Sequence, residues 1–294
     1  MSAISLFPRL DRLRINASHY DSITEAWRHI FGDNFHFGYF LSPDSTLDEA
    51  TDALIDKMAS LGAISDGTKL LDVGCGIGTP AFYLHRGYGC DITGISPSEA
   101  GIAQAEKECK KRGYEAKVRF RLGDGLNNGF DDDAFDVVWI MESSHLMKDK
   151  KRLFAECFRV LKPRGVMLLC DIMFRRPYTL TDRLGYLARM KLGFVGATLS
   201  NFRSFGWIQM ETFETYIRSA REVGFVDVVL TDISEQAIPT FECWKSNLLA
   251  KEESVLKTLT QGQIKSFLTA SDFSKDLFER EIDGYGILRA SKRG

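Results

Sequence analysis

A histidine and a carboxylate follow apolar segments of this chain and could act together as a base, and a second carboxylate lies near the histidine in the sequence. The segment 136–141 runs into Glu142 and, three residues later, His145, while the segment 166–171 ends at Asp171. If these segments are neighbouring parallel strands, their carboxyl ends place Asp171 close to the imidazole. A carboxylate on one ring nitrogen sets the tautomer, and the other nitrogen can then take a proton from a hydroxyl. The three side chains are therefore the candidate catalytic residues; the alternative is that His145 only caps a turn of helix.

A glycine-rich loop forms a second candidate site. Residues 70–78 read Leu-Leu-Asp-Val-Gly-Cys-Gly-Ile-Gly, which is an apolar strand with Asp72 near its end and then Gly74, Gly76 and Gly78. Glycine lets the backbone turn sharply and lie against a nucleotide-like ligand. The dinucleotide fingerprint needs two residues between its second and third glycines, so the alternating pattern argues against a nicotinamide dehydrogenase. A tight strand–helix turn without a ligand is the alternative.

Both sites require a sheet that collects strand ends at one edge. From residue 69 onwards, apolar runs alternate with helical stretches such as 97–112 and 150–161, the second of which is closed by Lys-Pro-Arg-Gly. This alternation predicts an α/β fold with a doubly wound sheet of seven strands. The strands are expected near residues 69–73, 91–95, 117–121, 136–141, 166–171, 226–232 and 284–290.

The remaining segments predict helical additions to one structural unit. We expect an N-terminal helical lid (1–66), a core (67–174), a lid insertion (175–224), and the end of the sheet (225–294), which carries a second helical insertion (235–283).

Composition limits the classes of function. The 294 residues are 44% hydrophobic and 27% charged, and the net charge of -2 argues against a general nucleic-acid binder. The 6 cysteines are scattered without metal-ligand spacing, so we expect neither a metal nor a disulfide framework. Because no apolar run reaches the roughly 18 residues that span a bilayer and no secretory signal is recognisable, we expect a cytoplasmic protein without a membrane partner.

The motifs resemble those of the class I methyltransferases, which bind S-adenosylmethionine (SAM). The glycine loop is similar to their motif I, the acidic turn and strand at 130–139 to motif II, and the turn at 159–165 to motif III. The resemblance covers residues 69–171 in the right order. It implies the Rossmann-like fold of that class and SAM as the cofactor, with Asp124, next to Gly125, accepting a hydrogen bond from the adenine amino group.

A narrower resemblance begins at the second strand. Its end, Gly-Ile-Ser-Pro-Ser at 94–98, is similar to the rebeccamycin-type sugar O-methyltransferases, the tocopherol methyltransferases and the cyclopropane fatty acid synthases. This implies that Ser96 lies at the ribose, where the class generally has an acid. Those relatives tend to carry a glutamine where this chain has Gly101, so Glu99 or Gln104 would have to substitute for it.

Two upstream tyrosines belong to the same resemblance. His-Tyr-Asp around Tyr20 and Phe-Gly-Tyr-Phe around Tyr39 recur in the group and imply that both rings close over the carboxylate and sulfonium of SAM, a contact that a cation–π attraction favours. Helix packing is the alternative for either ring. The expected cofactor-binding residues are Tyr20, Tyr39, Asp72, Gly74, Cys75, Gly76, Gly78, Ser96, Asp124 and Gly125.

The rebeccamycin-type enzymes also share the positions of His145 and Asp171 and use them as a base, which implies O-methylation here. They share the stretches 232–239 and 284–285 as well, so the resemblance spans nearly the whole chain. Cyclopropane synthases instead place a glutamate immediately before the histidine and a second histidine at the end of the fifth strand. Ser144 and Asp171 stand at those positions here, so we expect no cyclopropanation.

The acceptor is expected to be a small hydrophobic natural product beneath an aromatic lid, bound by a monomer or homodimer. C-methylation of an isoprenoid or aromatic carbon is an alternative, in which Glu142 removes a proton and Arg175, beside Arg176, meets a diphosphate. A SAM-binding regulator without catalysis is a further alternative. The expected substrate-binding residues are Phe174, Arg175, Tyr186, Phe205, Trp207 and Trp244.

Overall fold

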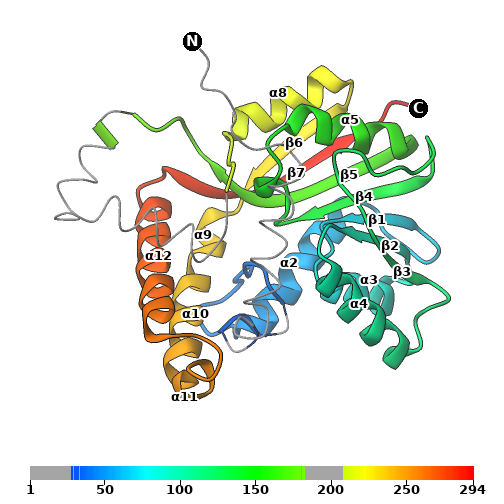
Figure 1. Ribbon diagram of the computed structural model, residues 1–294. Helices are drawn as coiled ribbons and strands as arrows, with labels where there is room; N and C mark the ends of the chain where they lie inside the picture. Colours follow the sequence, from blue (N-terminus) through cyan, green and yellow to red (C-terminus); the bar gives the residue numbers. More distant parts are fainter. Residues whose placement is uncertain (1–27, 29, 33, 180, 183–207) are drawn as a thin grey trace, which may run out of the picture.

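The computed structural model describes residues 28, 30–32, 34–179, 181–182 and 208–294. Seven strands form one sheet in the order β3-β2-β1-β4-β5-β7-β6 (Figure 1). All neighbouring pairs are parallel except those of β7, which runs antiparallel to β5 and β6. The bounds are β1 (Lys69–Val73), β2 (Asp91–Ser96), β3 (Val118–Leu122), β4 (Phe135–Met141), β5 (Leu161–Phe174), β6 (Val226–Asp232) and β7 (Asp283–Ser291).

Helices cover both faces of this sheet (Figure 1). On one face lie α2 (Leu47–Leu61), α3 (Thr79–Tyr88) and α4 (Glu99–Arg112), and on the other lie α5 (Lys150–Val160) and α8 (Phe213–Val223). The doubly wound α/β fold predicted from the sequence is therefore confirmed. Strand order reverses between β1 and β4, and such a reversal marks the ligand site of open α/β sheets.

The helical insertion expected at 235–283 lies between β6 and β7 and stands beside one end of the sheet in Figure 1. The insertion consists of α9 (Ser234–Ala237), α10 (Pro239–Ala250), α11 (Glu252–Val255) and α12 (Gln261–Glu279).

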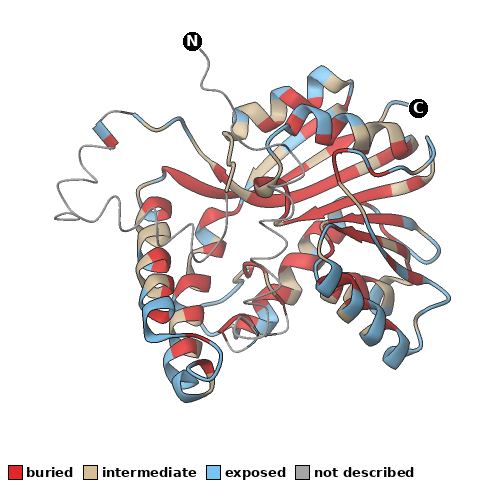
Figure 2. Cartoon of the chain, viewed as in Figure 1, coloured by how far each residue is buried: buried red, intermediate tan, exposed pale blue. Residues whose placement is uncertain are grey.

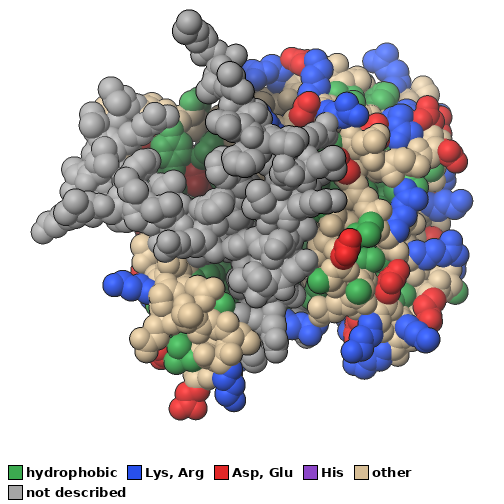
Figure 3. All heavy atoms as spheres, in the orientation of Figure 1, with side chains coloured by type: hydrophobic (Ala, Val, Ile, Leu, Met, Phe, Trp, Pro, Cys, Tyr) green, Lys and Arg blue, Asp and Glu red, His purple; other side chains and the backbone are tan. Residues whose placement is uncertain are grey.

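No helix among the described residues is both long and apolar enough to cross a membrane. On the face seen in Figure 3, acidic and basic side chains are interspersed.

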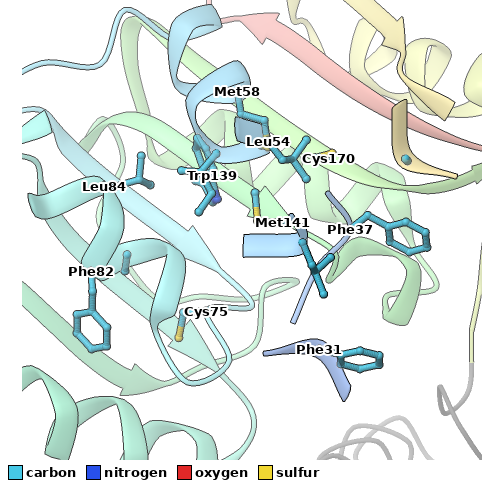
Figure 4. Close-up of a cluster of buried hydrophobic side chains, with 14 of the residues drawn as sticks. Phe31, Phe37, Leu54, Met58, Cys75, Phe82, Leu84, Trp139, Met141 and Cys170 are labelled. Carbon is cyan, nitrogen blue, oxygen red and sulfur yellow. The ribbon is translucent and has the colours of Figure 1, made fainter. Parts of the chain in front are cut away.

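The central strands are buried on both faces because their side chains alternate between two cores (Figure 2). Trp139 and Met141 of β4 and Cys170 of β5 point into the core under α2, with Leu54 and Met58 beside them (Figure 4). The alternate residues of the same strands pack against α5 and α8. Strands that are apolar on both faces explain why unbroken apolar runs predicted them.

Each expected strand lies within one residue of its observed bounds except β5, which is longer at both ends. Leu161 already pairs with Phe135, and the register then shifts before Val137 pairs with Val166. The expected Lys-Pro-Arg-Gly turn lies inside this irregular start of β5, where Arg164 has a φ of 68°. Residues 213–223 of the expected lid insertion form α8, which packs on the sheet.

Candidate active site

A cavity of about 280 Å³ opens at the carboxyl ends of the central parallel strands. The glycine loop after β1, Ser96 at the end of β2 and Asp124 after β3 line one part of it. His145 lines it after β4, and Asp283 at the start of β7 lines it beyond β5. The cavity therefore lies at the reversal of strand order, where the fold predicts a ligand.

The glycines of the loop differ in what surrounds them. Gly76 has a φ of 53° and faces open space, since a Cβ there would meet nothing within 4 Å. Gly78 has a φ of 84°, and a Cβ there would lie 2.6 Å from the Phe120 ring. Gly74 and Gly76 line the cavity, whereas Gly78 leaves room for the Phe120 ring of β3.

Two amides of the glycine loop are already bonded within the protein. The amides of Gly74 and Cys75 both donate to the Ile95 carbonyl, at 2.8 and 3.0 Å, because the loop turns back over β2. One oxygen of the Asp72 carboxyl is unpaired: the side chain is buried, it lines the cavity, and its Oδ2 has no hydrogen-bond partner among the described residues. Burial raises the pKa of Asp72 to about 7. A buried acid of this kind fits a ligand that brings an ammonium group.

Two serines stand where the ribose is expected. Ser96 and Ser98 line the cavity; Ser96 Oγ accepts from the Ser98 amide at 3.2 Å, and Ser98 Oγ accepts from the Gly101 amide at 2.9 Å. A Cβ on Gly101 would lie 3.2 Å from the Gly76 carbonyl oxygen, so the helix start lies close against the loop. Gln104 lines a separate groove.

Asp124 and Gly125 line the same part of the cavity, as expected. The Oδ1 atom of Asp124 accepts a hydrogen bond from the Leu126 amide at 2.9 Å.

His145 and Asp171 form the expected pair. The Nδ1 atom of His145 lies 2.6 Å from Asp171 Oδ1, and its amide donates to Asp171 Oδ2 at 2.9 Å. Ser144 and the Ile172 amide also donate to this carboxylate. Burial alone would raise the pKa of Asp171, but His145 and these hydrogen bonds hold it below its usual value. With Nδ1–H bound to a carboxylate, Nε2 is the ring nitrogen that can accept a proton.

A buried lysine supports the turn that carries His145, η1 (Ser144–Leu146). Lys150 Nζ donates to the carbonyl oxygens of Ser144 and Gln209 at 2.6 and 2.8 Å, and the Gln209 amide donates to the His145 carbonyl at 2.6 Å. Ser144 Oγ also lies 2.8 Å from the hydroxyl of Tyr216. Sequence reasoning missed these hydrogen bonds because Lys150 is the first residue of a helix and is followed by the exposed Lys151, so nothing in the sequence distinguishes it from a surface lysine.

Glu142 lines the cavity with a left-handed backbone of φ 47°. Its Oε1 accepts from the Phe37 amide at 2.6 Å and from the Tyr285 hydroxyl. Burial raises the pKa of Glu142 to about 7. Two further hydrogen bonds hold the same chain segment, from Gly38 N to Thr240 Oγ1 at 3.0 Å and from Tyr39 N to Ala50 O at 2.7 Å. Glu142 therefore anchors this segment against the sheet.

Of the expected substrate-binding residues that the structure describes, one lines the cavity and two do not. Trp244 of α10 lines the cavity. Phe174 does not: its ring packs edge-on against Tyr178, with centroids 5.3 Å apart. Arg175 is bound to Asp232 at 2.7 Å and to Glu281 at 3.3 Å, away from the cavity wall.

Among the expected cofactor residues, Tyr39 packs at the edge of the core and is not part of the cavity wall. Tyr39 directly follows Gly38, the glycine whose backbone lies against Ala50. The remaining expected residues lie outside the described part of the chain: Tyr20, Tyr186, Phe205 and Trp207.

Sequence reasoning missed several residues of the wall. His36 is buried beside Phe37; its Nδ1 bonds the Phe37 carbonyl at 2.8 Å, and burial lowers its pKa to about 4. From α12, Ser274 and Phe278 line the cavity one helical turn apart. No motif pointed to them, because the helix carries apolar residues on several sides and only packing decides which side meets the cavity.

Comparison with known proteins identifies the chain. Residues 71–169 match a family model described as a methyltransferase domain. Over 276 residues the chain is 33% identical to methyltransferase GfsG of Streptomyces halstedii, which covers 93% of this chain and 92% of that protein. The chain belongs to the class I SAM-dependent methyltransferases.

Two further proteins resemble this methyltransferase over its length. The 27-O-demethylrifamycin SV methyltransferase of Amycolatopsis mediterranei is 28% identical over 281 residues, 93% of this chain and 95% of that one. The structure of the cyclopropane synthase MmaA2 from Mycobacterium tuberculosis has a TM-score of 0.82 at 20% identity and covers 98% of this chain and 100% of its own, which shows a common fold.

SAM is the cofactor of this methyltransferase, as predicted. The buried, unpartnered Oδ2 of Asp72 fits the ammonium group of the methionine part, and the open backbone at Gly76 leaves room beside it. When bound, SAM supplies an electrophilic methyl group on a sulfonium. The residues of the chain then have to align an acceptor with that methyl group and exclude water.

Proposed function

We propose that this methyltransferase transfers a methyl group to a hydroxyl oxygen of a small, largely apolar natural product. His145 is the general base and Asp171 holds its tautomer. The observation that carries the proposal is the 2.6 Å contact between His145 Nδ1 and a fully buried carboxylate, at the wall of the cavity that begins at the SAM loop.

The base is needed because a neutral hydroxyl is a poor nucleophile. In the proposed mechanism Nε2 of His145 takes the hydroxyl proton as the oxygen–methyl bond forms, and Asp171 stabilises the resulting imidazolium. The carboxylate keeps its charge because its lowered pKa leaves it ionised at neutral pH. Ser144, which donates to the same carboxylate, fixes its orientation.

The walls support an apolar acceptor. Phe241 and Trp244 of α10 and Phe278 of α12 line the cavity, together with Ile172 of β5. The 27-O-demethylrifamycin SV methyltransferase is named for a hydroxylated natural product, and it resembles this chain from end to end. We therefore propose a hydroxylated natural product of comparable chemistry as the acceptor class.

C-methylation of an isoprenoid diphosphate is less well supported. Arg175, the expected diphosphate ligand, is paired with Asp232 and Glu281 outside the cavity wall, and Arg176 is paired with Asp182 at 2.5 Å. Glu142, the expected proton acceptor of that reaction, uses Oε1 to hold the Phe37 amide and the Tyr285 hydroxyl.

The test combines cofactor binding with turnover. 27-O-Demethylrifamycin SV and a panel of other hydroxylated natural products are incubated with SAM, and S-adenosylhomocysteine (SAH) formation and product mass are measured. For any acceptor that is methylated, we expect His145→Asn to lower kcat by roughly 100-fold or more, while the SAH Kd measured by calorimetry stays within about twofold. Unchanged turnover in this variant would refute the role of His145.

A further inference from the structure

Asp283 is a buried carboxyl that the proposed reaction does not use. It opens β7, lines the cavity, and is only 6% exposed. Its Oδ1 has no hydrogen-bond partner within the described part of the chain. An unpartnered buried polar atom is costly, so its presence in a cavity wall indicates a ligand group that completes it.

The sheet order places Asp283 on the acceptor side of the base. Along the sheet, the SAM loop follows β1, His145 follows β4, Asp171 lies on β5, and Asp283 lies on β7, one strand further. Asp283 pairs with Phe174, three residues beyond Asp171 on β5. Three residues along a strand and one strand across separate the two backbone positions by roughly 11 Å.

No ion pair or hydrogen bond of the Asp283 side chain is found within the described part of the chain, and its cavity has several apolar wall residues. Ser274 and Phe278 of α12 and Ile172 of β5 line the same cavity. The nearest arginine along the adjoining strand, Arg175, donates its amide to the Ile282 carbonyl at 2.9 Å but turns its guanidinium to Asp232 and Glu281. Burial, the only cause that moves the pKa of Asp283, raises it to about 8.

We propose that Asp283 is a polar anchor in the acceptor cavity and binds a second hydroxyl of the acceptor, on the side of the base away from the SAM loop. This inference rests on the proposed function and adds a specificity determinant to it. A carboxyl that is mostly protonated near neutral pH both donates and accepts, and so does a hydroxyl. An ammonium group only donates and requires the ionised carboxylate.

Simple probes test this anchor without knowledge of the natural acceptor. The SAH-loaded protein is titrated by calorimetry with α,ω-alkanediols of six to twelve carbons and with the 1-alkanols of the same lengths. We expect the wild-type protein to bind the best diol roughly tenfold tighter than its matching alkanol. Asp283→Leu should remove this preference, whereas Asp283→Asn, which can still donate and accept, should keep most of it.

The control is Asp272→Leu, which removes an exposed carboxylate from the outer side of α12, where it is paired with Lys245 at 3.0 Å. It should leave the diol preference intact. An SAH Kd within about twofold of wild type shows that a variant is folded; Asp283→Ala replaces the leucine variant if leucine does not fit.

A diol preference that is missing in the wild-type protein at every length, or that survives in Asp283→Leu, overturns the anchor. Tighter binding of ω-amino-1-alkanols than of diols at pH 7 overturns the assignment to a hydroxyl. Because these titrations need no methyl transfer, they separate a failure of the anchor from a failure of the proposed reaction, which the His145→Asn assay detects.

Discussion

Asp72 and Asp171 are both buried aspartates on strands that flank β4, yet their pKa values move in opposite directions. Burial raises the pKa of Asp72 to about 7, since no cation or donor among the described residues reaches its Oδ2. Asp171 is equally buried, but an imidazole and several donors hold its pKa below the usual value. Asp72 can therefore pair with a cationic group of a ligand, whereas the hydrogen-bonding partners of Asp171 all come from the protein.

The state of Asp72 predicts a pH dependence of cofactor binding. The ammonium group of SAH prefers the ionised carboxyl, so binding should release a proton at pH values below about 7. We expect the SAH Kd to rise by up to about tenfold per pH unit as the pH falls from 7 to 5.5, and to level off above pH 7. Calorimetry in buffers with different ionisation enthalpies measures both the Kd and the released proton.

The control for this experiment is Asp72→Asn, which cannot ionise. It should bind SAH more weakly at pH 7.5 and lose most of the pH dependence. A wild-type Kd that stays constant between pH 5.5 and 7.5 would contradict the proposed contact.

At the scale of elements, the base depends on the short turn η1 and its connections. Lys150, at the start of α5, donates to three carbonyl oxygens, those of Ser144, Met147 and Gln209. It thereby joins the turn that carries His145 to the segment after residue 207. Burial lowers the pKa of Lys150 to about 8, so the lysine holds these carbonyls at the expense of its own hydration.

Lys150→Met should therefore loosen the turn. Three carbonyl oxygens each lose one donor, and we expect the free energy of unfolding to fall by roughly 2 kcal/mol or more, with a lower kcat because His145 is held less firmly. Urea denaturation and a steady-state assay measure the two effects. Lys151→Met, which removes only an exposed ion pair with Glu222 at 3.0 Å, should change the unfolding free energy by less than about 1 kcal/mol. Equal effects of the two variants would refute the support role.

At the scale of the whole molecule, the cavity wall contains three buried acids whose pKa values are raised. Burial raises the pKa values of Asp72 and Glu142 to about 7 and that of Asp283 to about 8. The folded protein without ligands then takes up protons relative to the unfolded chain. The stability from this uptake is complete below the usual carboxyl pKa near 4 and is lost as the pH rises through the folded values.

The ligand-free protein should therefore become less stable between pH 5 and 8. Each buried acid contributes a fall on the order of 1 kcal/mol per pH unit below its folded pKa. Urea denaturation at intervals of one pH unit measures the slope, and Asp283→Asn should make it shallower. A free energy of unfolding that increases from pH 5 to 8 would contradict this expectation. Asp171 does not interfere, because its lowered pKa matters only in more acidic solution, whereas the lowered pKa of His36 offsets part of the fall below about pH 6.5.

Strand ends, the glycine loop and the His145–Asp171 pair could be predicted because they depend on local patterns and on parallel neighbours. Apolar runs marked the strands, and Gly74 and Gly76 marked a backbone that lies against a ligand. Since β4 and β5 are parallel and adjacent, His145 just after β4 and Asp171 near the carboxyl end of β5 had to meet at the same edge.

The sequence by itself thus determined the fold and the cofactor, and it indicated His145 and Asp171, the pair that we propose as the base. Apart from Trp244, the wall of the proposed acceptor site was decided only by the tertiary structure, because it comes from α10, α12 and the segment around Phe37, whose cavity-facing sides no local pattern reveals. Arg175 was expected in the site but pairs with acids outside it. Asp283 was missed because β7 is antiparallel: its first residue, rather than its last, lies at the edge where the parallel strands end.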